Sequence, residues 1–199
     1  EYDNWGNITR QVENINHTDD PTKGRIKTTI NQYFGTNSLS IEGFPYEGVR
    51  QTEKQIVSGL KNLLIAQCEN DGYLTIYKAN AYDRFGQNIW AGIYNDNHWA
   101  ITTTEYKDGE ISKQISPLGW ETEYSYENKN SQIIKTVNYM DKNISLKSAK
   151  SIYTSNKLWE KDGNGNETKY TYDKLGRITK TEQPEGKIDY IEYDDKQKT

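Results

Sequence analysis

The stretch Tyr172-Asp173-Lys174-Leu175-Gly176-Arg177-Ile178-Thr179 decides the fold of this chain. It recurs as Tyr2-Asp3-Asn4-Trp5-Gly6-Asn7-Ile8-Thr9 and as Tyr82-Asp83-Arg84-Phe85-Gly86-Gln87. Each copy reads Tyr-Asp, any residue, a large apolar residue, Gly and then a polar residue. Decayed copies begin at four further tyrosines, Tyr106, Tyr126, Tyr139 and Tyr193. A motif that returns in this way is typical of a repeat protein.

A second, turn-like element keeps a fixed distance to the tyrosine of the motif. Its copies are Ser116-Pro117-Leu118-Gly119, Asp162-Gly163-Asn164-Gly165 and Gln183-Pro184-Glu185-Gly186. The last glycine of each copy lies seven residues before the next tyrosine, in the pairs Gly119 and Tyr126, Gly165 and Tyr172, and Gly186 and Tyr193. Because the three loops differ in sequence, the equal offsets indicate one structural repeat of about 20 residues.

The residue pattern within a repeat predicts β-strands. Thr168, Tyr170 and Tyr172 alternate with charged and polar residues, which places the aromatic rings on one face of a strand. In neighbouring repeats the same face is expected to carry Thr122, Tyr124 and Tyr126, and Asp189, Ile191 and Tyr193. The stretch after the Asp-x-x-Gly turn, 177–181, is rich in β-branched residues and predicts the second strand of a hairpin.

The turn between the two strands has its own chemistry. Gly176 stands where a hairpin loop needs a positive φ, and the Asp173 side chain can accept hydrogen bonds from the turn backbone. A single hairpin of this size cannot bury a face, so successive hairpins must stabilise one another. The sequence therefore predicts an all-β chain of successive antiparallel hairpins in a curved or spiralling sheet. We expect a single domain over 1–199, with a degenerate stretch at 13–70.

Composition excludes several classes of protein. Only 33% of the 199 residues are hydrophobic, which is a sign of disorder, but 12% are aromatic, which favours a folded chain. No apolar run approaches the ~20 residues of a membrane-spanning helix. The net charge of -4, with both signs interspersed, removes the electrostatic basis of nucleic-acid binding. Cys68 is the single cysteine and is expected to be a small buried residue, while His17 and His98 share no metal-ligand spacing.

Three groups of residues invite a functional interpretation. Asp162 begins a loop that resembles a calcium loop, but Glu167 stands at its sixth position and Asp173 at its twelfth, where an EF-hand needs Gly and Glu. The acidic residues Asp3 and Asp83 recur at positions equivalent to Asp173, so they predict a ladder of turn-stabilising carboxylates rather than a converging acid and base. The sequence thus predicts no enzyme activity, no catalytic residue, no cofactor and no metal site. Four tryptophans could form a glycan-stacking platform or pack on one face of the sheet, namely Trp90, Trp99, Trp120 and Trp159. Packing on the sheet face is the favoured interpretation.

Residues 13–70 break the repeat. The stretch 16–24 predicts an exposed loop, and 28–34 predicts a strand. The stretch from Gln51 to Cys68 fits both a helical face and a strand that enters a hairpin at Asn70-Asp71-Gly72. The strand is favoured because of the turn signal and the repeats on both sides.

The motif at 172–179, with Pro184-Glu185-Gly186 and Tyr193-Asp194 after it, resembles the Rhs/YD repeat of large bacterial surface and secreted proteins. The resemblance is specific over 157–195, good over 71–128 and 1–12, and weak over 13–70. It implies these repeat-motif residues, all structural: Tyr2, Asp3, Gly6, Tyr82, Asp83, Gly86, Gly119, Tyr126, Gly165, Tyr172, Asp173, Gly176, Arg177, Gly186, Tyr193 and Asp194.

What the family does sets the functional expectation. Its sheets spiral into a hollow shell that encloses a toxic C-terminal domain in polymorphic toxins and in the B/C cocoon of toxin complexes, and wall-associated relatives occur. The resemblance implies a non-catalytic shell segment of a secreted or cell-surface protein, whose partner is the remainder of its own polypeptide. The alternative is a glycan-binding or adhesion module. The family's self-cleavage element carries Asp-Pro-x-Gly, whereas Ser116 begins the nearest equivalent here, so we expect that element and any toxin domain to be missing from this chain. Because Glu1-Tyr2-Asp3 opens in the middle of the repeat pattern, we expect the chain to be a piece of a longer one.

Cut sheet edges predict weak self-association by strand addition. The N-terminal strand around Ile8, Thr9 and Val12 carries few charges and is the expected contact. The C-terminal edge carries charges that oppose such pairing, on Lys187, Asp189, Glu192 and Asp194.

Overall fold

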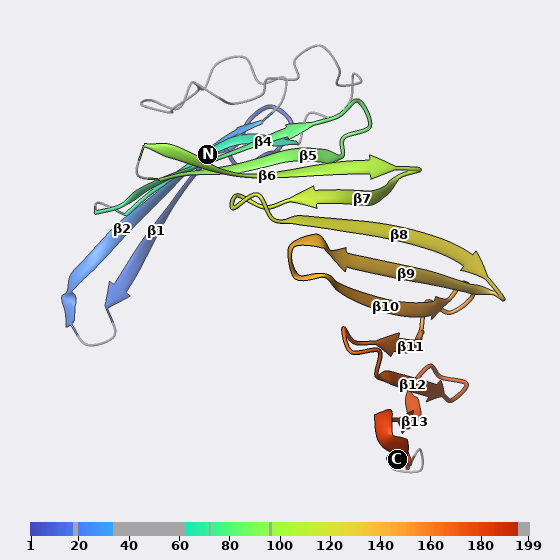
Figure 1. Cartoon of the computed structure of the whole chain (residues 1–199). Coiled ribbons are helices and arrows are strands. Elements are labelled where there is room, and N and C mark those ends of the chain that lie inside the picture. Colours follow the sequence, from blue (N-terminus) through green and yellow to red (C-terminus); the bar gives the residue numbers. More distant parts are fainter. Residues whose placement is uncertain (18–19, 34–62, 72, 96, 195–199) are drawn as a thin grey trace. The chain divides into compact units, whose positions relative to one another are not determined.

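The computed structural model describes residues 1–17, 20–33, 63–71, 73–95 and 97–194. These residues form one 14-stranded sheet whose strand order, β1 to β14, follows the sequence (Figure 1). Each strand is therefore hydrogen-bonded to the strands before and after it, and the pairs are antiparallel. The predicted chain of successive antiparallel hairpins is confirmed.

The strands of the first half are β1 (Arg10–His17), β2 (Asp20–Tyr33), β3 (Leu64–Asn70), β4 (Thr75–Tyr82), β5 (Asn88–Asn95), β6 (His98–Lys107) and β7 (Glu110–Ile115). Those of the second half are β8 (Glu121–Lys129), β9 (Gln132–Tyr139), β10 (Ile144–Ser151), β11 (Lys157–Lys161), β12 (Glu167–Tyr172), β13 (Ile178–Glu182) and β14 (Ile188–Tyr190). Two 3-10 turns, η1 (Met140–Lys142) and η2 (Pro184–Gly186), follow β9 and β13. The chain divides into two compact units, Glu1–Glu110 with Gln114–Gly119, and Ile111–Lys113 with Trp120–Thr199.

The core of the first unit is built from small side chains around one large ring. Ala79 and Ala81 of β4 are buried, and Trp90 of β5 is only 2% exposed. Only glycine fits at position 92, because a Cβ there would lie 2.7 Å from the ring of Trp90 and 2.8 Å from the ring of Trp99. These rings lie 5.7 Å apart between centroids. Small residues thus make room for the indoles that a single sheet face needs for burial.

Cys68 belongs to the same buried cluster. Burial raises the pKa of its thiol, which keeps the thiol protonated and unreactive near neutral pH. The prediction of a small buried cysteine is confirmed.

In the second unit, strand register places the aromatic row on one face. Tyr124 pairs with Val137 and Tyr126 with Lys135 across β8 and β9. Tyr170 of β12 pairs with Thr181 of β13, which in turn pairs with Asp189 of β14. Because paired residues point to the same side of a sheet, these side chains share a face, as the alternation predicts.

Two expectations for 13–70 need correction or completion. The described residues of the stretch 16–24 lie in strands rather than in a loop, because β1 continues to His17 and β2 begins at Asp20. The predicted strands are confirmed at Thr28–Tyr33, within β2, and at Leu64–Asn70, which is β3. Residues 51–62 of the ambiguous stretch lie outside the described residues.

Candidate functional site: the repeated aspartate turn and its tyrosine

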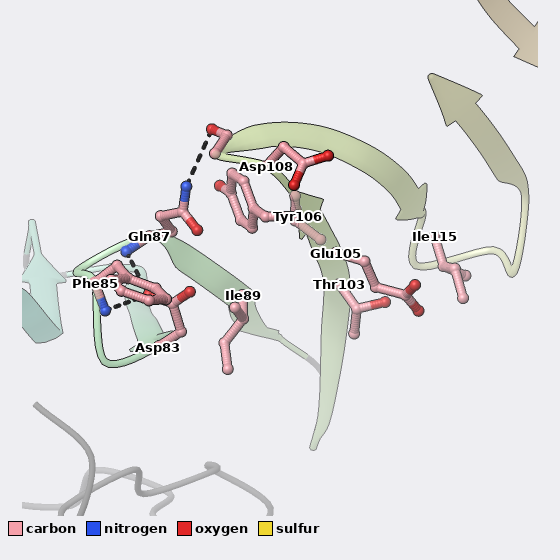
Figure 2. Close-up of a pocket in the computed structure, with 11 residues that line it drawn as sticks. Asp83, Phe85, Gln87, Ile89, Thr103, Glu105, Tyr106, Asp108 and Ile115 are labelled. Carbon is pink, nitrogen blue, oxygen red and sulfur yellow. Dashed lines mark hydrogen bonds between the residues drawn. The ribbon is translucent and has the colours of Figure 1, made fainter. Parts of the chain in front are cut away.

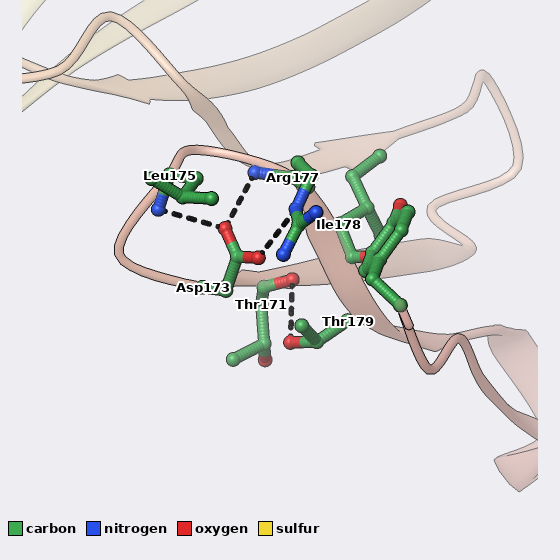
Figure 3. Close-up of polar contacts among 7 residues, drawn as sticks. Thr171, Asp173, Leu175, Arg177, Ile178 and Thr179 are labelled. Carbon is green, nitrogen blue, oxygen red and sulfur yellow. Dashed lines mark hydrogen bonds and ion pairs between the residues drawn. The ribbon is translucent and has the colours of Figure 1, made fainter. Parts of the chain in front are cut away.

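The turn at Asp173 is held by a network centred on one carboxylate (Figure 3). Oδ1 of Asp173 accepts hydrogen bonds from the backbone N–H groups of Leu175 and Arg177, both at 2.9 Å. Oδ2 accepts one from Nε of Arg177 at 2.7 Å. The backbone closes the loop as well, since the Gly176 N–H donates to the Asp173 carbonyl at 3.1 Å. Gly176 has φ +79°, the positive value that the sequence predicts.

The same network recurs at three other aspartates. Oδ1 accepts from the N–H groups two and four residues later at 2.8–2.9 Å in each case, and these aspartates are Asp3, Asp83 and Asp162. The glycine three residues on has φ near +80° each time, namely Gly6 at 82°, Gly86 at 81° and Gly165 at 85°. The sequence interpretation placed Asp162 in a different class of turn. Its spacing to Gly165 and Asn166, the same as that of Asp3 to Gly6 and Asn7, was the available signal.

Hydrogen bonding stabilises the charged form of two of these carboxylates, those of Asp173 and Asp162. The backbone N–H of Arg177, followed by its side chain, lowers the pKa of Asp173. The side-chain amide of Asn166, with backbone N–H groups, lowers the pKa of Asp162. The carboxylates are therefore ionised structural acceptors at neutral pH, which is the opposite of what a general acid needs.

The tyrosine of the motif has a role that sequence reasoning missed. Its hydroxyl donates to the carbonyl of the first residue of the preceding strand. Tyr172 donates to Lys157 at 2.7 Å, and Tyr193 donates to Ile178 at 3.0 Å. The first unit repeats this contact in two pairs, Tyr82 to Leu64 at 3.0 Å and Tyr106 to Asn88 at 3.1 Å. We call this contact the tyrosine clamp, and each clamp ties the end of one strand to the start of the strand before it.

Arg177 connects its turn to the following hairpin. Asp173 fixes the guanidinium at 2.7 Å, and the guanidinium carbon lies 4.2 Å from the ring centroid of Tyr193. The Tyr193 hydroxyl in turn clamps Ile178. Aspartate, arginine and tyrosine of successive repeats thus form one connected set of contacts.

The remaining motif residues are placed less uniformly. Tyr126 lies in the middle of β8, opposite Lys135, and is not followed by an aspartate turn. Tyr2 is 71% exposed and forms an isolated bridge with Ile8. Gly119 and Gly186 have φ of 81° and 84° and close turns without an aspartate, and Asp194 follows Tyr193 beyond β14.

The four tryptophans do not form one exposed platform. Trp90 is buried in the core of the first unit, so it drops out of the candidate glycan contacts. Trp99 packs on Trp90 and on Tyr94, whose ring lies 5.3 Å away. In the second unit Trp159 donates from Nε1 to Gln132 at 3.1 Å and lies opposite Ala149, while Trp120 is 52% exposed.

A groove of about 1130 Å³ lies beside the Asp83 turn (Figure 2). In this copy the side-chain amide of Gln87, four residues after the aspartate, donates to the Gly109 carbonyl at 3.1 Å, while its backbone N–H donates to Asp83 Oδ1 at 2.9 Å. Glu105 and Asp108 line the same groove. Among the described residues, no three His, Cys, Asp or Glu side chains are grouped closely enough to hold a metal ion.

These turns and clamps define a class of protein, a tandem array of β-hairpins. Residues 159–188 match the family described as RHS Repeat, and they contain the Asp162 and Asp173 turns. The resemblance to Rhs/YD-repeat proteins that the sequence predicts is confirmed, with the family match at 159–188.

Comparison with solved structures supports the same fold. A chain in the crystal structure of TcdB2-TccC3-Cdc42 is similar with a TM-score of 0.58 and 14% identity. The match covers 90% of this chain and 9% of that chain's length. No curated protein matches the sequence. Within the described part of the chain, no helix has the length and apolar character needed to cross a membrane.

Proposed function

We propose that this chain is a non-catalytic structural segment of a larger Rhs/YD-repeat protein, in which it forms part of the wall of a β-shell. The observation that carries this proposal is the repeated network of aspartate turn and tyrosine clamp. Every hydrogen bond of that network connects one hairpin to itself or to its neighbour, so the network serves to extend a sheet. The RHS repeat at 159–188 and the shared fold support it.

The enclosed or presented cargo is a C-terminal toxin or effector of the same polypeptide, and the protein is secreted or exposed at the cell surface. This part of the proposal rests on the family resemblance. The ionised carboxylates of Asp162 and Asp173 support the non-catalytic part of the proposal, because they accept hydrogen bonds from the turns.

Protease access in the full-length protein tests enclosure. A specific protease site placed in the C-terminal domain should resist cleavage in the intact protein and be cut when the shell is opened by denaturant. The matched control carries the same site in an exposed loop at the N-terminal side of the repeats. Equal cleavage of the two sites in the intact protein would overturn enclosure.

The alternative is a glycan-binding or adhesion module, and one observation favours it. Trp120 is half exposed, with the ammonium of Lys142 5.5 Å from its ring, and exposed indoles stack on sugar rings. Calorimetric titration with neutral and acidic oligosaccharides separates the two functions. Saturable binding that Trp120→Ala abolishes and Tyr153→Ala, at another exposed ring, leaves intact would favour the glycan module.

We further propose weak self-association of the chain by strand addition, because β1 stands at one end of the strand order. The expected contact at Ile8 and Thr9 needs revision. Glu1 already bonds the Thr9 N–H at 2.9 Å, and Tyr2 bridges to Ile8.

A further inference from the structure

The turn at Asp83 matches the turn at Asp173 in its backbone. Oδ1 of Asp83 accepts from the N–H groups of Phe85 at 2.8 Å and Gln87 at 2.9 Å. The Asp83 N–H donates to the Gln87 carbonyl at 3.0 Å, and the Gly86 N–H donates to the Asp83 carbonyl at 3.1 Å. The corresponding two distances in the Asp173 turn are 2.9 Å and 3.1 Å. The two turns can therefore be compared position by position.

The tyrosine that follows each turn also makes the same contact. The clamp of Tyr106 goes to Asn88, five residues after Asp83, at 3.1 Å. The clamp of Tyr193 goes to the residue five after Asp173, at 3.0 Å. Burial, and then the charge of Asp83, raises the pKa of Tyr106, which agrees with a carboxylate close to this ring. Each turn thus combines an aspartate with the clamped tyrosine that follows it.

The two turns differ at the residue four positions after the aspartate. In the Asp173 turn this residue is Arg177, whose guanidinium bonds Oδ2 at 2.7 Å and lies 4.2 Å from the ring centroid of the following tyrosine (Figure 3). In the Asp83 turn it is Gln87, whose side-chain amide donates to a different backbone carbonyl (Figure 2). Among the described residues, no side chain donates to Oδ2 of Asp83, whereas one does so in each of the other three turns.

The groove beside the Asp83 turn is suited to a cation. Its lining residues all belong to the first compact unit, and no Lys, Arg or His is among the described ones. Three carboxylates line it, those of Asp83, Glu105 and Asp108. The ring of Tyr106 lines it as well, while Arg84 directs its guanidinium to the Phe85 ring, 4.6 Å from the centroid. Negative charge beside an aromatic face is the combination that holds a guanidinium.

We propose that the groove beside Asp83 binds an arginine side chain of a partner polypeptide, with the guanidinium between Oδ2 of Asp83 and the ring of Tyr106. The Asp173 turn supplies the pattern for this contact, since Arg177 makes it there from within the chain. Arginine is favoured over lysine because its planar guanidinium donates in pairs to a carboxylate and stacks on an aromatic ring. The partner thus completes at the Asp83 turn the contacts that the Asp173 turn completes by itself.

Titration of the isotope-labelled chain with acetyl-argininamide, followed by NMR, tests the proposal. Saturable shifts are expected at the backbone amides of Phe85 and Gln87, and acetyl-lysinamide should bind several-fold more weakly. Asp83→Asn should abolish the saturable shifts, because the amide keeps an oxygen for the turn N–H groups but removes the charge. Glu123→Gln, at an exposed carboxylate of the second unit, should leave them unchanged.

A second variant fills the same place from within the chain. Gln87→Arg should set a guanidinium on Oδ2 of Asp83, as Arg177 does in its own turn, and so prevent binding of acetyl-argininamide. The same variant should unfold at a higher urea concentration, because it adds a charge-assisted hydrogen bond. Gln87→Leu is the matched control, since it also loses the bond to Gly109 but adds no cation, and its binding should persist.

Two results would overturn the proposal. One is the absence of saturable shifts at the Asp83 turn of the unmodified chain. The other is binding that Gln87→Arg leaves intact or that acetyl-lysinamide matches, which would indicate attraction of any cation to an acidic surface. Neither result bears on the shell function, which the protease experiment tests on a different part of the molecule.

Discussion

At the scale of single residues, the glycine of the turn provides the positive φ, and the aspartate accepts the hydrogen bonds of the turn backbone. Gly176 has φ +79°, and a Cβ there would meet only Nδ2 of Asn156, at 3.8 Å. A side chain would therefore fit in space, and the cost of placing one arises from the backbone conformation alone. Asp173 meanwhile satisfies two backbone N–H groups that the tight turn leaves unpaired.

Gly176→Val should destabilise the chain by about 1–3 kcal/mol, because a β-branched residue resists positive φ. Urea denaturation of the purified chain measures the change. Lys174→Val is the matched control, since Lys174 is an exposed position of the same turn without a positive φ. Equal losses of stability in both variants would show that Gly176 does not act through its conformation.

Asp173 should contribute to stability at neutral pH and lose that contribution in acid. Hydrogen bonds from Arg177 hold the folded pKa of Asp173 below that of an unperturbed aspartate, so the contribution is present above the unfolded pKa and disappears as the pH falls through the folded pKa. Asp173→Asn should therefore reduce the difference in unfolding free energy between neutral and acidic buffers. Glu123→Gln, at an exposed strand carboxylate with no hydrogen bond in the described structure, should leave that difference unchanged.

At the scale of elements, the clamp explains why a tyrosine stands before the aspartate. Tyr172 is the last residue of β12, and its hydroxyl reaches the first carbonyl of β11, the neighbouring strand. Phenylalanine would keep the ring but leave that carbonyl without its partner. The contact therefore stabilises the pairing of two strands at the end where ladder hydrogen bonds stop.

Tyr172→Phe should cost about 1 kcal/mol, the usual net value of one hydrogen bond. The loss should appear in urea denaturation and as faster amide exchange in β11 and β12. Tyr190→Phe provides the control, because Tyr190 is 70% exposed and its hydroxyl has no hydrogen bond in the described structure. If both variants unfold at the same urea concentration, the clamp contributes nothing measurable.

The elements also show what sequence patterns can and cannot predict. The seven-residue offset from Gly165 to Tyr172 spans one linking residue and the six residues of β12, so strand order and turn glycines were predictable. The same offset failed at Tyr126, because β8 continues to Lys129 and turns at Asn130 and Ser131, whose positive φ values replace a glycine. Clamps were not predictable, since each joins residues 15 or 18 positions apart whose pairing depends on strand register. The burial of Trp90 was not predictable either, because it depends on small residues in other strands, whose position beside Trp90 follows from strand register.

At the scale of the whole molecule, stability is shared among neighbours rather than held in one centre. Nearly all large pairings join consecutive strands, and the buried side chains gather mainly in β3, β4 and β5. This arrangement suits a wall, which is extended by adding hairpins. The exposed apolar residues at turn tips, such as Phe85 and Leu175, leave surface that a larger assembly can cover.

The single domain expected over 1–199 predicts one cooperative unfolding transition. Calorimetry should then give a calorimetric enthalpy equal to the van't Hoff enthalpy. Two separate transitions would contradict a single cooperative domain and assign one to each unit.

The structure of the full-length protein, determined by electron cryo-microscopy, tests the central claim most directly. The account predicts that residues 1–194 lie in the wall of a closed β-shell, with β1 to β14 in sequence order and the C-terminal domain inside. A map in which these strands form a free-standing sheet, with the C-terminal domain outside and open to solvent, would contradict it.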